Sequence, residues 1–122
     1  MISTVETLLD NVVYGQASGN YDGSSQLFYS DAVRAANYYG GQGSIQTAGI
    51  RVTSFIGRVV IEATLADQPS IQAAWFEIAE YGDLINPSNG YYPATVTGNF
   101  TFIRARVEGF DAGTINFVNL TY

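Results

Sequence analysis

Carboxylates lie on both sides of the only tryptophan of this chain, in the stretch IEATLADQPSIQAAWFEI at residues 61–78. Glu62 and Asp67 precede Trp75, and Glu77 follows it. Two carboxylates that flank a bound sugar are the catalytic groups of most glycosidases. The chain has no histidine and no cysteine, so hydrolysis would have to rest on such a pair. The stretch has three interpretations: a sugar-cleaving site, a binding face, or two strands without further function.

The best candidates for a catalytic pair are Asp67 and Asp83, which fall in expected loops at strand ends. Eleven acidic residues make a chance pair common, and nothing in the sequence indicates a raised pKa for either aspartate. YDGSS at 21–25 has too few acidic ligands for a calcium loop. GGQGS at 40–44 lacks the lysine of a phosphate loop. We therefore expect no enzymatic activity, no cofactor and no metal site.

Composition indicates one folded domain that spans residues 1–122. Hydrophobic residues make up 47% of the chain and charged residues 13%, which is enough apolar material for one core. All five basic residues are arginines and the formal net charge is −6. Without clustered positive charge we expect no nucleic acid and no anionic membrane as a partner. The first residues resemble no secretion signal, and no stretch has the length of a membrane span.

Alternating apolar and polar residues, separated by turn residues, predict an all-β fold. The expected strands lie at about 4–9, 11–15, 26–30, 33–39, 44–56, 58–65, 73–79, 98–107 and 113–122. This spacing favours an antiparallel β-sandwich, jelly-roll-like, of about eight strands. The connecting features are an extended N-terminal arm at 1–10, a loop at 15–26, a loop at 85–93 and a hairpin turn at 109–115.

Two segments have a helical alternative. Ser3 and Glu6 have the spacing of a capping box, and SDAVRAANYYGG at 30–41 is rich in alanine. Val12 and Val13 follow the first segment directly and favour a strand there. We therefore favour extended structure in both places.

Strand periodicity divides the region around Trp75 between two faces. Side chains alternate along a strand, so Phe76 and Ile78 share the core face while Trp75 and Glu77 share the opposite one. Trp75 would then lie where a partner chain, a sugar or an overlying loop can cover it. The alternative is a strand that is buried on both faces.

A second strand, in NFTFIRARVEGF at 99–110, places Arg104 and Arg106 on one face. Glu62 and Glu77 are suitable acceptors if the strands are neighbours, and each cross-strand pair would contribute about 0.2–1 kcal/mol. The other interpretation is a contact surface, because arginine and aromatic residues are common at interfaces.

Tyrosine is in excess, with nine residues, and it includes two adjacent pairs beside glycine or proline. Exposed tyrosines supply a large contact area at low entropic cost, and they also cap the ends of sandwiches. The candidate interface residues are Tyr38, Tyr39, Trp75, Tyr91, Tyr92, Arg104 and Arg106.

The order of four segments carries a family resemblance. They are TLLDNVVYG, VRAANYYG, VTSFIGRVVIEATLADQPSIQAAWFEI and TGNFTFIRARVEGFDAGTINFVNLTY. Together they resemble small structural proteins and domains of tailed bacteriophages, especially contractile-tailed phages of marine bacteria. The resemblance covers residues 50–122 well and 1–49 loosely. A weaker similarity to galactose-binding-like jelly rolls implies glycan binding without catalysis, although a calcium site is missing.

The resemblance implies a non-enzymatic virion protein, assembled in the host cytoplasm. Its expected role is capsid decoration or cementing, and the alternatives are a tail, neck or fibre component or a host-attachment domain that binds a bacterial surface glycan. The expected partners are copies of the chain itself and other virion proteins, such as the major capsid or tail protein. A bacterial glycan is a further expected ligand.

Overall fold

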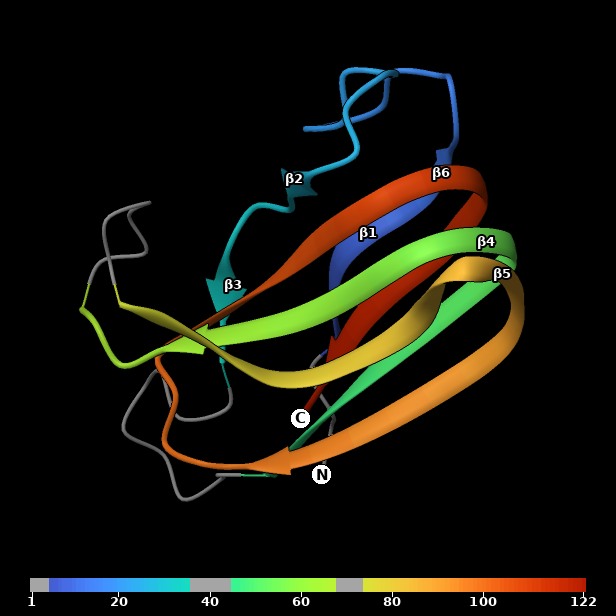
Figure 1. Cartoon of the computed structure of the whole chain (residues 1–122). Helices are drawn as coiled ribbons and strands as arrows, with labels where there is room; N and C mark the ends of the chain where they lie inside the picture. The colour runs from blue at the N-terminus through green and yellow to red at the C-terminus, as the bar shows by residue number, and fades with distance from the viewer. Residues whose placement is uncertain (1–4, 36–44, 68–73) are drawn as a thin grey trace.

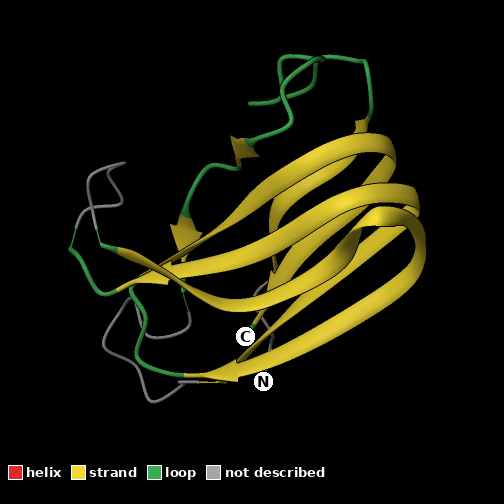
Figure 2. Cartoon of the chain, in the orientation of Figure 1, coloured by secondary structure: helices red, strands yellow, loops and turns green. Residues whose placement is uncertain are grey.

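The computed structural model describes residues 5–35, 45–67 and 74–122, and this part of the chain is all-β and antiparallel, as the sequence predicted. Figure 2 shows strands and loops in these ranges and no helix. The strands are β1 (Val5–Val13), β2 (Phe28–Tyr29), β3 (Val33–Arg34), β4 (Ile45–Thr64), β5 (Trp75–Thr97) and β6 (Phe102–Thr121). They form one hydrogen-bonded sheet in the order β1-β6-β4-β5, and β2 and β3 also pair with β6.

Three long strands bend back on themselves, and Figure 1 shows that the two halves of the sheet consequently face each other. The first half of β4 pairs with the second halves of β5 and β6, and its second half pairs with their first halves. The bends coincide with glycines of positive φ, a backbone conformation that residues with a Cβ rarely adopt. These glycines are Gly57 in β4, Gly82 and Gly90 in β5, and Gly109 and Gly113 in β6.

The core lies between the two halves of the sheet. Ile50 and Val52 from the first half of β4, and Val59 and Ile61 from its second half, are all at most 2% exposed and belong to one hydrophobic cluster. Strand alternation explains the pattern, because every second side chain of each half points between the layers. In contrast, no residue of β5 is buried.

The loop between β1 and β2 closes one end of the core. Tyr21 from this loop is 1% exposed, and its ring centroid lies 5.0 Å from that of Phe28 and 5.1 Å from that of Phe110. Its hydroxyl accepts a hydrogen bond of 3.0 Å from the Gly15 N–H. The stretch is the loop that the sequence predicted, but it also supplies a core residue.

The structure has fewer and longer strands than the sequence predicts. At the points where a turn between two strands is expected, one strand bends and continues. The sequence predicts two strands at 44–56 and 58–65, and their described residues belong to the single strand β4, except Leu65, which follows its end. Likewise, 98–107 and 113–122 largely join in β6, so the predicted hairpin turn at 109–115 is wrong. β-Bulges lie at the bends, and β4 and β6 remain paired by backbone hydrogen bonds on both sides of them. The division into two separate sheets of a jelly-roll-like sandwich stays a prediction.

One further prediction of irregular structure is wrong. The loop expected at 85–93 lies inside β5, where Gly90, Tyr91, Tyr92 and Pro93 pair with β4. Residues 5–10 of the expected N-terminal arm are extended, as the strand predicted at 4–9 indicates, and they belong to β1, which pairs antiparallel with β6. Proline is tolerated in β5 because this strand lies at the end of the described sheet order.

We expect Gly113→Ala to be much more destabilising than Gly15→Ala. Both glycines have nearly the same φ, +88° and +86°, so each substitution should cost about 1 kcal/mol of left-handed strain. A Cβ at Gly113 would also collide with the backbone of Ser54 and Phe55, whereas Gly15 has nothing within 4 Å of that position. The backbone must then move, which adds about 1–3 kcal/mol. Urea unfolding measures both variants, and equal losses would contradict the close approach of β4 and β6.

Asp22 should make the folded state sensitive to acid. The Ser24 N–H, then the hydroxyl and N–H of Ser25, donate hydrogen bonds to its carboxylate and lower its pKa from 3.8 to about 2. The ionised form therefore stabilises the fold fully above pH 3.8, and this contribution is lost as the pH falls towards about 2. An NMR titration should show the low pKa and its rise in Ser25→Ala. An unchanged pKa in that variant would contradict the assigned bonds.

Candidate functional site

The outer surface of one half of the sheet carries a network of seven charged side chains, which we call the ionic face. It is formed by the second half of β4 and the first halves of β5 and β6. Its members are Arg58, Glu62, Glu77, Glu80, Arg104, Arg106 and Glu108. Strand register explains the grouping, since Glu62 pairs with Arg104 of β6 on one side and with Glu77 of β5 on the other.

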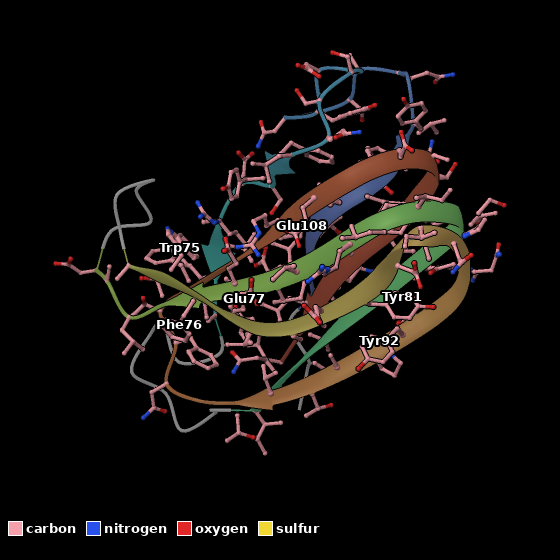
Figure 3. The ribbon with its side chains drawn as sticks, viewed as in Figure 1. Trp75, Phe76, Glu77, Tyr81, Tyr92 and Glu108 are labelled. Atoms are coloured by element: carbon pink, nitrogen blue, oxygen red, sulfur yellow. The ribbon has the colours of Figure 1, made fainter. Side chains whose placement is uncertain are left out.

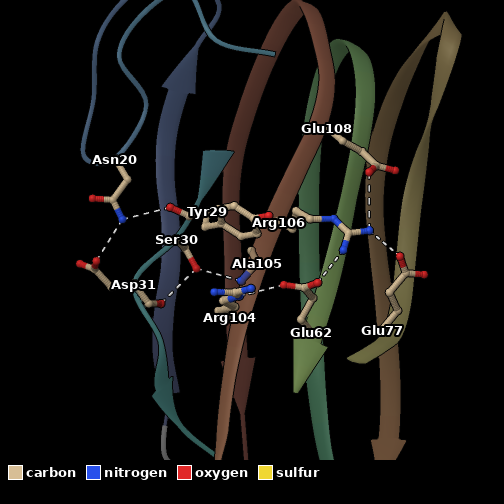
Figure 4. Close-up of polar contacts among 10 residues, drawn as sticks. All are labelled: Asn20, Tyr29, Ser30, Asp31, Glu62, Glu77, Arg104, Ala105, Arg106 and Glu108. Atoms are coloured by element: carbon tan, nitrogen blue, oxygen red, sulfur yellow. Dashed lines mark hydrogen bonds and ion pairs between the residues drawn. The ribbon is translucent and has the colours of Figure 1, made fainter. Parts of the chain in front are cut away.

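Glu62 is the centre of the ionic face. It is only 4% exposed, and both of its carboxylate oxygens are occupied. Oε1 accepts a hydrogen bond from Arg104 Nε at 2.8 Å, and Oε2 accepts one from Arg106 Nη1 at 2.5 Å (Figure 4). The predicted cross-strand ion pairs are thus confirmed, and on the Glu62 side they are largely buried.

Arg106 extends the network towards β5 and the bend. Its Nη2 also contacts Glu77 and, at 3.5 Å, Glu108 Oε2. Burial alone would lower the pKa of Arg106, but the hydrogen bond to Glu77 and the charges of Glu62 and Glu108 outweigh it and raise the pKa. Arg106 is therefore protonated, and it holds three carboxylates from three strands together.

Arg104 lies between two aromatic rings. Its guanidinium carbon is 4.2 Å from the Trp75 ring centroid and 4.3 Å from that of Tyr29. Stacking on both sides favours the cation, because the faces of aromatic rings carry negative partial charge. Trp75 is partly exposed on the face opposite the core, which confirms the assignment from strand periodicity and rules out a strand buried on both faces (Figure 3).

The two aspartates that the sequence offered as candidates for a catalytic pair, Asp67 and Asp83, lie far apart. Asp83 pairs with Gly57 at the bend, whereas Asp67 lies beyond the opposite end of that half of β4. Seven residues of strand separate the two ends, which is roughly 20 Å and well beyond the spacing of glycosidase carboxylates. Asp83 instead accepts hydrogen bonds from the N–H groups of Asn86 and Ile85, which lower its pKa.

The adjacent tyrosines of β5 serve different surfaces. Tyr92 faces the core side and stacks on Tyr81 from the other half of β5, with centroids 4.7 Å apart and an interplanar angle of 8°. Figure 3 shows the two rings side by side at the edge of the molecule. Tyr91 points to the outer surface of the other half of the sheet, where it contacts Phe117. Tyr91 therefore lies on the outer surface of the sheet, and Tyr92 lies on its core side.

The predicted interface residues do not form one continuous surface. Trp75, Arg104 and Arg106 lie together on the ionic face, and Tyr91 and Tyr92 lie on the other half of the sheet. Tyr38 and Tyr39 lie outside the described residues.

Nothing in the sequence indicates the free side of β5, which we call the β5 edge. This strand has 23 residues and ends the described sheet order, so no described strand pairs with its second side. Its bend exposes Leu84 and Ile85, which are 47% and 81% exposed. The segment INPSNGYYP predicts a loop at this place in β5, because Pro and Asn-Gly are typical of loops.

The chain matches no protein-family model, and no curated protein matches its sequence. Within residues 5–35, 45–67 and 74–122 there is no helix long and apolar enough to cross a lipid bilayer. The same ranges contain no group of three or more side chains placed to hold a metal ion.

We expect Glu62→Gln to lower the free energy of unfolding by about 3 kcal/mol, because it leaves two arginines beside a neutral, largely buried amide. Glu80→Gln is the matched control. The Glu80 side chain is 54% exposed, and Arg58 is its one ion-pair partner among the described residues, so its loss should cost no more than about 1 kcal/mol. Chemical denaturation of both variants measures the difference. Similar small losses would show that the buried network is not important for stability.

Proposed function

We propose that this chain is a non-enzymatic structural protein of a bacteriophage particle, with decoration or cementing of the capsid as its role. The sequence resemblance over residues 50–122 supports the virion setting. The β5 edge is the structural observation that supports an assembly role, because it offers a long unpaired strand to a neighbour.

An edge strand presents a row of backbone N–H and C=O groups that a second strand can pair with. Natural proteins protect such edges with charged side chains, especially lysine, or with proline, bulges or short strands. In β5 the segment from Trp75 to Asn86 contains neither lysine nor proline, and its Glu77 and Glu80 are paired with arginines of the same chain. Its only described irregularity opposite β4 before the bend is one bulge. The exposed Leu84 and Ile85 add an apolar contact at the bend. These features favour strand pairing with another chain.

The proposed partners are a second copy of this chain and the major shell protein. Pairing between two copies of β5 would use the same surface on both chains, as two-fold symmetric dimers do. The net charge of −6 would keep unassembled subunits apart in solution. The ionic face supports this role indirectly, since its charges are paired within the chain and stiffen the strands that carry the edge.

The first test is the protein content and structure of purified particles. Mass spectrometry should detect this chain, and a reconstruction should place it on the shell with β5 against a neighbouring chain. Detection of the chain in the tail, the neck or a fibre would exclude the capsid role, and its absence from the particle would contradict the proposal as a whole.

Ile85→Lys should weaken assembly about 10-fold or more, because it places a charge in the apolar contact of the edge. Val5→Lys is the control, since Val5 is 60% exposed but lies in β1, at the opposite end of the described sheet order from β5. Both variants are measured by light scattering of concentrated protein and by occupancy on particles. Equal behaviour of the two variants would show that the β5 edge is not the contact.

A further inference from the structure

The outer surface of the second half of the sheet differs from the ionic face. We call it the threonine face, because its strand register brings hydroxyl and amide side chains into rows across β4, β5 and β6. These side chains are Thr47, Thr53, Thr95, Thr114, Asn116, Asn119 and Thr121. Three of the hydroxyls already have partners on this face: Thr47 pairs with Thr95 at 2.9 Å, and Thr53 donates to Asn116 at 2.8 Å.

Tyr91 lies across the middle of the threonine face. A Cβ added to Gly49 would lie 2.7 Å from the Tyr91 hydroxyl oxygen and 2.9 Å from its Cε1, so the ring covers this glycine and occupies the space of a side chain. The ring reaches Phe117, whose ring stands at 88° to it with a centroid distance of 5.3 Å. Tyr91 is nevertheless 60% exposed. The side of the ring away from β4 is therefore open to solvent.

Arg51 lies beside this ring. The register places it directly between Tyr91 of β5 and Phe117 of β6, and it is exposed. Arg51 makes no hydrogen bond or ion pair with any residue that the structure describes, whereas Arg104 and Arg106 are held by carboxylates. A guanidinium presents a planar fork of donors that matches a carboxylate. This surface thus has a free cationic group that fits an anionic ligand.

Asn119 completes the arrangement from the other side. It pairs with Gly49 in the register, so its side chain lies next to the ring that covers this glycine. Its amide also has no hydrogen bond within the described ranges. An amide supplies both donors and an acceptor, as vicinal sugar hydroxyls require.

We propose that the threonine face binds an acidic sugar residue within a polysaccharide. The C–H face of the pyranose ring stacks on the open side of Tyr91, because polarised C–H groups are attracted to the negative face of an aromatic ring. The sugar carboxylate pairs with Arg51, and a hydroxyl bonds to Asn119. The site is an open sheet surface, so an internal unit of a long chain fits it. A flat ring with separated polar groups favours a sugar over a protein segment.

The test uses the purified chain with two polyuronates of different sugar geometry, polygalacturonate and alginate. Affinity electrophoresis should show retardation by at least one of them, which weakens as salt is added. Methyl-esterified polygalacturonate retains the sugar backbone but lacks the charge, so it should bind at least 10-fold more weakly than the acid form if polygalacturonate is the ligand. Absence of retardation by both polyuronates would overturn the proposal.

Variants locate the site. Arg51→Gln should weaken binding about 10-fold or more, and Arg58→Gln, the same charge change on the ionic face, should leave it unchanged. Tyr91→Ala should abolish binding while Tyr91→Phe retains it, and circular dichroism checks that each variant is folded. If Tyr91→Ala fails to fold, the comparison of Arg51→Gln with Arg58→Gln tests whether the sugar binds at this site. Equal binding by Arg51→Gln and the unaltered chain would overturn the proposal.

The outcome is independent of the proposed virion role. Purified subunits bind or fail to bind the polymer without any particle, whereas the decoration role is tested on particles. A chain found on the shell that binds no polyuronate would refute only the sugar site. A chain that binds polyuronate but is absent from particles would refute only the virion role.

Discussion

The bends of β4, β5 and β6 meet at one place, and the rest of the structure depends on this meeting. Gly57 of β4 pairs with Asp83 of β5, and the space of its missing side chain is filled by Phe55 and by the backbone of Glu108 and Phe110 from β6. Since each strand continues through the bend, one sheet supplies both walls of its own core. A bulkier residue at the bend would force apart strands that are paired over most of their length. The meeting of the bends therefore fixes which side chains of each half face the core and which face the outside.

The two outer faces use their polar groups in different ways. On the ionic face, Glu62 is buried between Arg104 and Arg106, and an unpaired charge there would be strongly destabilising. The network therefore favours one register of β4 against β6, because a shift by one residue would move these side chains to the core side. On the threonine face, Arg51 has no such partner among the described residues. Charges satisfied within the chain stabilise the fold, and charges left open are available to a ligand.

The β5 edge and the threonine face are compatible within one chain. Strand pairing at the edge uses the backbone of β5, whereas the Tyr91 side chain lies over β4 and points away from that edge. A subunit joined to neighbours through β5 would still present Tyr91 and Arg51 to solvent. An assembled array would repeat the sugar site at regular intervals, and multiple weak contacts to one polymer would then add to a much higher overall affinity.

Local alternation in the sequence determined which side chains share a face of a strand. It correctly indicated the all-β fold, the position of Trp75 opposite the core, and the grouping of Arg104 and Arg106 with Glu62. The tertiary structure decided the rest. Glycine at a turn and glycine at a bend look alike in sequence, so β4 and β6 were each divided in two. Three features depend on which strands are neighbours and in what register: the separation of Asp67 from Asp83, the covering of Gly49 by Tyr91, and the lack of a partner for Arg51 among the described residues. Side-chain periodicity along one strand contains no information on that pairing, because cross-strand register is fixed by contacts between residues far apart in the chain.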